Sequence, residues 1–81
     1  MNKLDKQIKV NYSNMMKIDK GYQDLVTNIV CYLRGKLNSV DAEEAINDVN
    51  DILLGAQSRG EDLEVLVGDY EEFCDNIIDA Y

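Results

Sequence analysis

Residues Ser39–Gly60 read SVDAEEAINDVNDILLGAQSRG, and this one segment carries a helix start, a sustained helical pattern and a helix stop. Asp41 followed by Glu44 is a capping-box pattern, and Gly60 suits the left-handed residue that closes a helix. Small or apolar residues recur on one side of a cylinder turning about 100° per residue. They are Ala42, Ala45, Ile46, Val49, Ile52, Leu53 and Ala56. The segment predicts a long amphipathic helix over Asp41–Arg59 with an acidic outer face.

The composition favours a single all-α domain. A chain of 81 residues is near the lower limit for independent folding, where about 60–65% of the unfolded surface can be buried. The sequence has no proline, five glycines and 46% hydrophobic residues, which is typical of a folded protein rather than a disordered one. No apolar run reaches the ~18–20 residues of a membrane span, and the N-terminal residues lack the apolar core of a signal peptide. We therefore expect a cytoplasmic protein.

Helical periodicity continues on both sides of this segment. We expect a single compact domain of four or five short helices, in which residues 1–18 form a basic amphipathic helix and residues 19–81 an acidic helical body. Asp19 is the expected N-cap of the second helix, and Gly68 is expected to separate the last two, a single bent helix being the alternative. The further helices are predicted at Leu4–Met16, Lys20–Arg34, Leu63–Val67 and Tyr70–Ala80.

The predicted N-terminal helix has an apolar and a basic face. Lysines lie opposite the apolar residues, which are Leu4, Ile8, Tyr12, Met15 and Met16. The simplest expectation is that this apolar stripe packs on the core while the lysines face water. Contact with an anionic membrane, or with an acidic neighbour, is the alternative.

Charge is distributed unevenly along the chain, whose net charge is −8. Residues 1–36 contain seven basic and three acidic side chains, whereas residues 37–81 contain one basic and thirteen acidic ones. The acidic part would repel phosphate, which argues against nucleic acid as its partner. It favours a cationic partner surface, either on another protein or on the chain's own N-terminal helix.

Several residues are left over once the expected core is assigned. Glu44, Asp48 and Asp51 lie at i, i+4 and i+7 on one face of the central helix, and Leu54 projects towards the same polar side. Cys31 projects opposite the apolar stripe of its helix, which suggests cover by another element or a second chain, or else a reactive thiol. The candidate interaction surface comprises Glu44, Asp48, Asp51, Leu54, Cys31, Lys3, Lys6 and Lys9.

The sequence gives little support for a catalytic site or a metal site. The chain has no histidine, and it shows neither a glycine-rich phosphate loop nor a nucleophile elbow. Cys31 and Cys74 are too far apart in sequence for a C-x-x-C site, and Cys74 lies on the apolar face expected to enter the core. Rows of carboxylates on outer helix faces usually contact water rather than a metal ion. We expect a protein that is not an enzyme and has no cofactor.

Three runs of the sequence carry a family resemblance: Tyr22–Arg34, Asp48–Asp62 and Val67–Ile78, with Gly60-Glu61-Asp62 to Phe73-Cys74-Asp75 the most specific part. Over roughly residues 19–81 the chain resembles a small helical family of unknown function from low-GC Gram-positive bacteria. That family is often labelled automatically as a ferritin-like DNA-binding protein. The resemblance implies a compact, left-handed superhelical arrangement and no catalytic residues. A ferritin-like di-iron site needs Glu-x-x-His pairs, which a chain without histidine cannot supply.

These observations lead to one expected function and its alternatives. We expect a non-catalytic interaction or regulatory module that binds a basic protein surface through its acidic face. Self-association, through the Cys31 face or the first helix, is a further expectation for so small a core. The alternative is a membrane-surface or nucleic-acid-associated module that uses the basic N-terminal helix.

Overall fold

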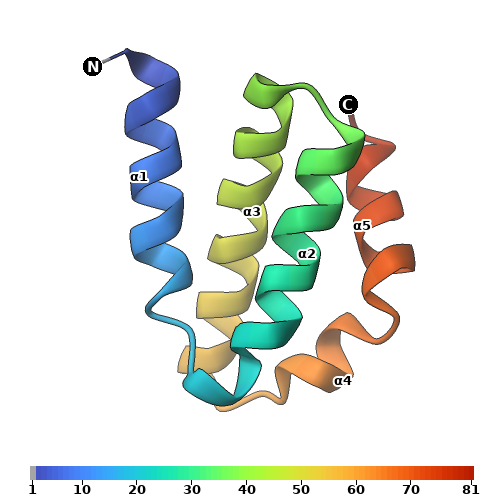
Figure 1. Cartoon of the computed structure of the whole chain (residues 1–81). Helices are drawn as coiled ribbons and strands as arrows, with labels where there is room; N and C mark the ends of the chain where they lie inside the picture. Colours follow the sequence, from blue (N-terminus) through green and yellow to red (C-terminus); the bar gives the residue numbers. More distant parts are fainter. Residues whose placement is uncertain (1) are drawn as a thin grey trace.

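Helix α3 (Ser39–Ser58) is the longest of the five α-helices in the computed structural model, which describes residues 2–81 (Figure 1). The part of the chain that the structure describes contains no strand, and the prediction of a single all-α domain is confirmed. Each predicted helix is present with ends shifted by three residues or fewer. The remaining elements are α1 (Lys3–Met15), the 3-10 helix η1 (Lys20–Tyr22), α2 (Gln23–Lys36), α4 (Leu63–Val67) and α5 (Tyr70–Ile78).

The start of α3 differs from the prediction. Asn38, rather than Asp41, is the N-cap, because its side-chain oxygen accepts a hydrogen bond of 2.9 Å from the Asp41 backbone N–H. The predicted capping box between Asp41 and Glu44 is therefore wrong, and the helix begins two residues earlier. Gly60 follows the helix with a φ of +76°, so the predicted left-handed stop is confirmed.

The start of α2 differs as well. Asp19 makes no side-chain capping hydrogen bond, and the 3-10 turn η1 precedes the α-helix that the sequence placed directly after it. A 3-10 turn is a common way for the chain to enter a helix when no side chain satisfies the first N–H groups.

Gly68 separates α4 from α5, so the two segments are not one bent helix. Its φ of +63° and ψ of −128° lie in a region open mainly to glycine. Asp69 then caps α5 by accepting hydrogen bonds from the backbone N–H groups of Glu71 at 2.9 Å and Glu72 at 3.5 Å. Asp62 caps α4 in the same way through Glu64.

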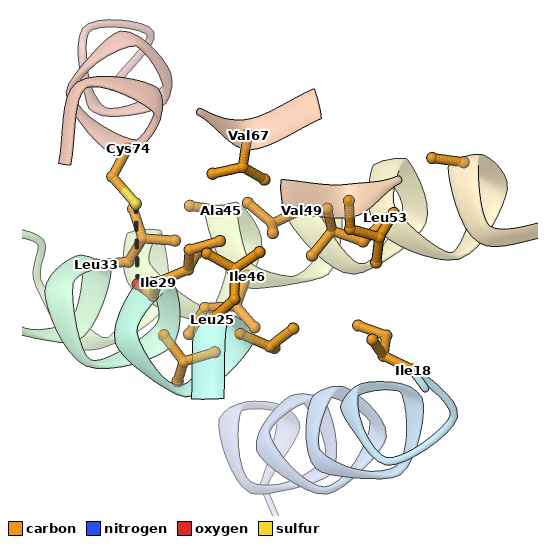
Figure 2. Packing of buried hydrophobic residues seen from close by; sticks show 14 residues of the cluster. Ile18, Leu25, Ile29, Leu33, Ala45, Ile46, Val49, Leu53, Val67 and Cys74 are labelled. Atoms are coloured by element: carbon orange, nitrogen blue, oxygen red, sulfur yellow. Dashed lines mark hydrogen bonds between the residues drawn. The ribbon is translucent and has the colours of Figure 1, made fainter. Parts of the chain in front are cut away.

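The hydrophobic core lies between α2 and α3 and is closed by α4 and α5 (Figure 2). The buried thiol of Cys74 points from α5 to the carbonyl oxygen of Ile29, 4.0 Å away, as the dashed line in Figure 2 shows. The prediction that Cys74 is a core residue is confirmed. The fully buried large side chains include Val26, Ile29, Leu33, Ile46, Val49, Leu53 and Leu63.

Two residues of α3 are placed differently from the prediction. Ile52 belonged to the predicted apolar stripe, but 45% of its surface is exposed. Leu54 was expected on the polar side, but it is half-buried and packs against the core cluster. The packing of neighbouring helices decides which side of a helix is buried. Around α3 the buried side includes Ile46, Asn50 and Leu53, and Ile52 lies outside it.

Helices α1 and α5 lie at opposite edges of the molecule. α1 packs mainly on α3, and α5 packs mainly on α2, which leaves α2 and α3 in the centre (Figure 1). In residues 2–81, no helix combines the length and the apolar composition needed to cross a bilayer.

Candidate interaction surface

The prediction that the apolar stripe of α1 packs on the core is wrong for Ile8, Tyr12 and Met16, whereas Met15 does pack on the core and Leu4 is half-buried. Asn11 is almost completely buried, at 1% exposure, while Tyr12 is 62% and Met16 54% exposed. Ile8 is exposed as well. Amides therefore occupy the middle of the seam between α1 and α3, and part of the predicted apolar stripe remains on the outside.

Asn11 is at the centre of this seam. Its Nδ2 donates to the backbone oxygen of Glu43 at 2.9 Å and to the Glu43 carboxylate at 3.1 Å. Its Oδ1 accepts from Gln7 Nε2 at 2.9 Å, and its backbone oxygen accepts from Asn50 Nδ2 at 3.1 Å. Asn11 thus ties α1 to two turns of α3.

Glu43 extends the seam to α2. Arg34 donates to its carboxylate through Nε at 3.0 Å and through Nη2 at 3.1 Å, a bidentate pair. Burial raises the pKa of Glu43, but the hydrogen bonds from Arg34 and Asn11 outweigh it and hold the pKa below its ordinary value. The hydrogen bond to Glu43 likewise raises the pKa of Arg34. We call Gln7, Asn11, Arg34, Glu43 and Asn50 the Asn11 cluster.

One polar atom of the Asn11 cluster has no partner. Asn50 is fully buried, and its Oδ1 accepts no hydrogen bond within the part of the chain that is described. A buried acceptor without a donor costs free energy. The fit of α1 to α3 is therefore incomplete at this point.

Two cavities flank α1. One, of about 290 Å³, lies between its first turns and the start of α3 and is lined by Lys3, Leu4, Gln7, Val40, Glu43 and Glu44. The other, of about 220 Å³, lies between α1 and α2; Tyr12, Met15, Val30 and Cys31 are part of its mostly apolar lining. The structure therefore brings Lys3 together with Glu44, and Cys31 together with α1.

The acidic row of α3 is on the surface as predicted. Glu44, Asp48 and Asp51 are exposed, and Asp48 accepts a hydrogen bond of 3.3 Å from the Tyr81 hydroxyl. Partial burial and the neighbouring Asp48 raise the pKa of Tyr81. Among residues 2–81, no three Asp, Glu, Cys or His side chains are grouped so that they could hold a metal ion.

Positive charge does little to neutralise this surface. In the described residues the ion pairs are Arg34 with Glu43 and Arg59 with Glu61, so no lysine takes part in one. Lys6 and Lys9 are exposed on α1 and line neither of the two cavities. Most carboxylates of α3, α4 and α5 consequently face solvent without a cation beside them.

The remaining predicted site residues lie apart from this acidic row. Cys31 is exposed on α2, as its projection predicted, and no element of the described chain covers it. Leu54 is only partly exposed, because it packs on the core. The predicted surface is thus split between the acidic row of α3, the seam under α1, and the outer side of α1 and α2.

Sequence reasoning missed Asn11, Glu43 and Asn50. A signal for them exists, because Glu43 and Asn50 share one side of α3 with Ile46 and Leu53, at i, i+7 and i+3, i+10. Polar residues within an apolar arc predict a buried polar contact. The matching row on α1 is Gln7, Asn11 and Asn14.

Comparison with protein-family models, with curated proteins and with solved structures finds no match to this chain. The resemblance to the Gram-positive helical family therefore stays a prediction.

Proposed function

We propose that the protein is a non-catalytic binding module whose acidic helical body, residues 19–81, takes a basic segment of a partner protein. One observation carries the proposal. The exposed row Glu44, Asp48 and Asp51 has no lysine or arginine paired with it. Like charges at i, i+3 and i+4 destabilise a helix, and a basic partner would relieve that repulsion.

A labelled, lysine-rich amphipathic peptide of unrelated sequence tests this proposal by fluorescence anisotropy. We expect binding at about 50 mM salt that weakens steeply towards 300 mM, because exposed charges are screened within the Debye length. The variant Glu44→Gln, Asp48→Asn, Asp51→Asn should lose most of this binding.

A second triple variant is the matched control. Glu71→Gln, Glu72→Gln, Asp79→Asn removes the same charge from exposed positions on and next to α5. We expect it to bind the peptide nearly as well as the unsubstituted chain. Equal losses in both variants would mean that net charge alone attracts the peptide, and the proposal of a specific acidic face would be abandoned.

A membrane-surface role for α1 is the second candidate, and one structural feature favours it. Tyr12 of α1 and Met16 directly after it are exposed, as are Lys6 and Lys9, so this segment presents apolar and basic side chains outwards together. Co-sedimentation with phosphatidylcholine vesicles containing about 30% phosphatidylserine tests this role. Binding at low salt that Tyr12→Ser and Met16→Ser abolish would support it, whereas protein remaining in the supernatant would exclude it.

A further inference from the structure

Helix α1 occupies a groove that its side chains do not fill completely. The floor of this groove is the side of α3 that carries Glu43, Ile46 and Asn50, with Arg34 on the α2 wall. Cavities remain on both flanks of α1, and Asn50 Oδ1 lacks a donor. A helix with a different set of side chains could therefore fit this groove.

Apolar side chains of α1 contact the body mainly near its two ends, where Leu4 is half-buried and Met15 packs on the core. Because Ile8, Val10 and Tyr12 are already exposed, removing α1 from the body exposes additional apolar surface on α1 itself mainly at Leu4 and Met15. The middle of α1 is fixed by hydrogen bonds from Asn11 to Glu43 and from Asn50 to Asn11, and its last residue by one from Gln23 to the Met15 oxygen. Hydrogen bonds of this kind can be exchanged for those of another helix, or for water, with modest change in free energy.

Charge identifies the kind of helix that this groove accepts. Residues 1–18 carry four lysines and one aspartate, while residues 19–81 carry four basic and fifteen acidic side chains. The groove therefore already accommodates a basic amphipathic helix on a strongly acidic body. Glu44, in the proposed acidic face, lines the cavity at the open end of the groove together with Lys3.

We propose that α1 is an exchangeable occupant of this groove, and that a partner's basic amphipathic helix displaces it by placing an amide side chain where Asn11 bonds to Glu43. This inference rests on the proposed function and names its partner class. Because α1 is tethered through Lys17–Asp19, its effective concentration at the groove is high. The apparent affinity for a partner helix is therefore its intrinsic affinity multiplied by the fraction of molecules in which α1 is undocked.

The test uses the full chain and a labelled synthetic peptide of residues 2–18 as the competing helix. We expect Asn11→Ala in the protein to tighten peptide binding about tenfold, because the tethered competitor is weakened. The same substitution in the peptide should weaken binding by a similar factor. If the substitution raises the affinity when the protein carries it and lowers the affinity when the peptide carries it, both helices must bind in the same groove.

Ser13→Ala in the protein is the matched control, because Ser13 is exposed on α1 and lies outside the Asn11 cluster. It should leave the affinity for the peptide unchanged. Amide hydrogen exchange supplies a second readout that does not depend on any variant folding. On addition of the unsubstituted peptide, amides of α1 should exchange faster while those of α2 and α3 stay protected.

The outcomes separate the two proposals. If the residue 2–18 peptide binds and the exchange of α1 does not change, displacement is wrong, although binding of a basic segment stands. If neither this peptide nor the unrelated lysine-rich peptide binds at about 50 mM salt, the proposed function fails and the displacement model fails with it.

Discussion

Glu43 is the residue on which three helices meet. It belongs to α3, accepts a hydrogen bond from Asn11 of α1 and forms a bidentate pair with Arg34 of α2. A buried carboxylate is tolerated only when its oxygens are paired, and here both are. Removing one partner should therefore lower the free energy of unfolding by more than the net contribution of a single hydrogen bond.

Asn11→Ala should lower the free energy of unfolding by about 1–3 kcal/mol, since it removes the side-chain donor that bonds to the buried carboxylate and backbone oxygen of Glu43. Glu43→Ala should cost a similar amount. In the double variant the two losses should not add, with a coupling of about 1–2 kcal/mol. Urea unfolding followed by circular dichroism measures all four proteins, and strictly additive losses would contradict the hydrogen bonds described.

The depressed pKa of Glu43 sets the sign of a pH effect. A carboxyl whose pKa is lower in the folded state stabilises the protein above its unfolded pKa, and this contribution is lost as pH falls through the folded pKa. Glu43→Gln should therefore cost stability at pH 7 and much less at pH 3. The urea midpoints of the unsubstituted chain and of Glu43→Gln at the two pH values measure this difference. The effects of all other carboxylates cancel, because both proteins contain them. A cost that does not change with pH would contradict the assignment.

The two cysteines should differ sharply in reactivity. Cys31 is exposed, whereas Cys74 is fully buried, and burial together with Asp75 raises its pKa to about 11. At pH 8, Ellman's reagent should modify one thiol per chain quickly, and two after unfolding in urea. Cys31→Ser should abolish the fast reaction, whereas a second fast thiol in the native protein would show that α5 does not cover Cys74.

At the scale of single elements, the glycine breaks at Gly60 and Gly68 followed local sequence rules, whereas the starts of α2 and α3 and the orientation of α1 differed from the prediction. Gly68 separates α4 from α5 as the sequence predicted, and Asp69 caps α5, because positive φ and side-chain capping are local properties. The orientation of α1 is not local. Asn11 is buried because α3 presents Glu43, whose carboxylate and backbone oxygen accept hydrogen bonds from it.

Two glycine substitutions should change stability in opposite directions. Gly68→Ala forces a side chain into a region that L-residues rarely adopt, and we expect a loss of about 1–3 kcal/mol. Gly35 lies inside α2 with no atom within 4 Å of where a Cβ would be, so Gly35→Ala should gain about 0.5–1 kcal/mol. Thermal unfolding of both variants measures the two effects. A neutral Gly68→Ala would mean that the chain turns differently between α4 and α5.

At the scale of the whole molecule, uneven charge is the dominant feature. The chain carries −8 overall, with its basic residues concentrated in the first 36 positions and its free carboxylates on α3, α4 and α5. Self-repulsion of this kind favours solubility and weakens the compact state.

The variant Glu44→Gln, Asp48→Asn, Asp51→Asn should therefore unfold at a higher temperature than the unsubstituted chain, by about 2–6 °C at low salt. The difference should shrink at 300 mM salt, where the repulsion is screened. Calorimetry at both salt concentrations measures it. A lower unfolding temperature would show that the acidic row takes part in stabilising contacts within the chain.

The sequence by itself determined the all-helical class, the breaks at Gly60 and Gly68, the buried position of Cys74 and the exposed acidic row on α3. These features follow from periodicity, backbone conformation and charge, which are properties of short segments. Only the tertiary structure decided that Leu54 packs on the core, that Ile52 does not, and that α1 buries Asn11 and exposes Tyr12. The physical reason is that the side of a helix that becomes buried depends on which side chains the neighbouring helices place against it. Here they present a buried carboxylate, and a buried carboxylate selects amide and guanidinium partners over apolar ones.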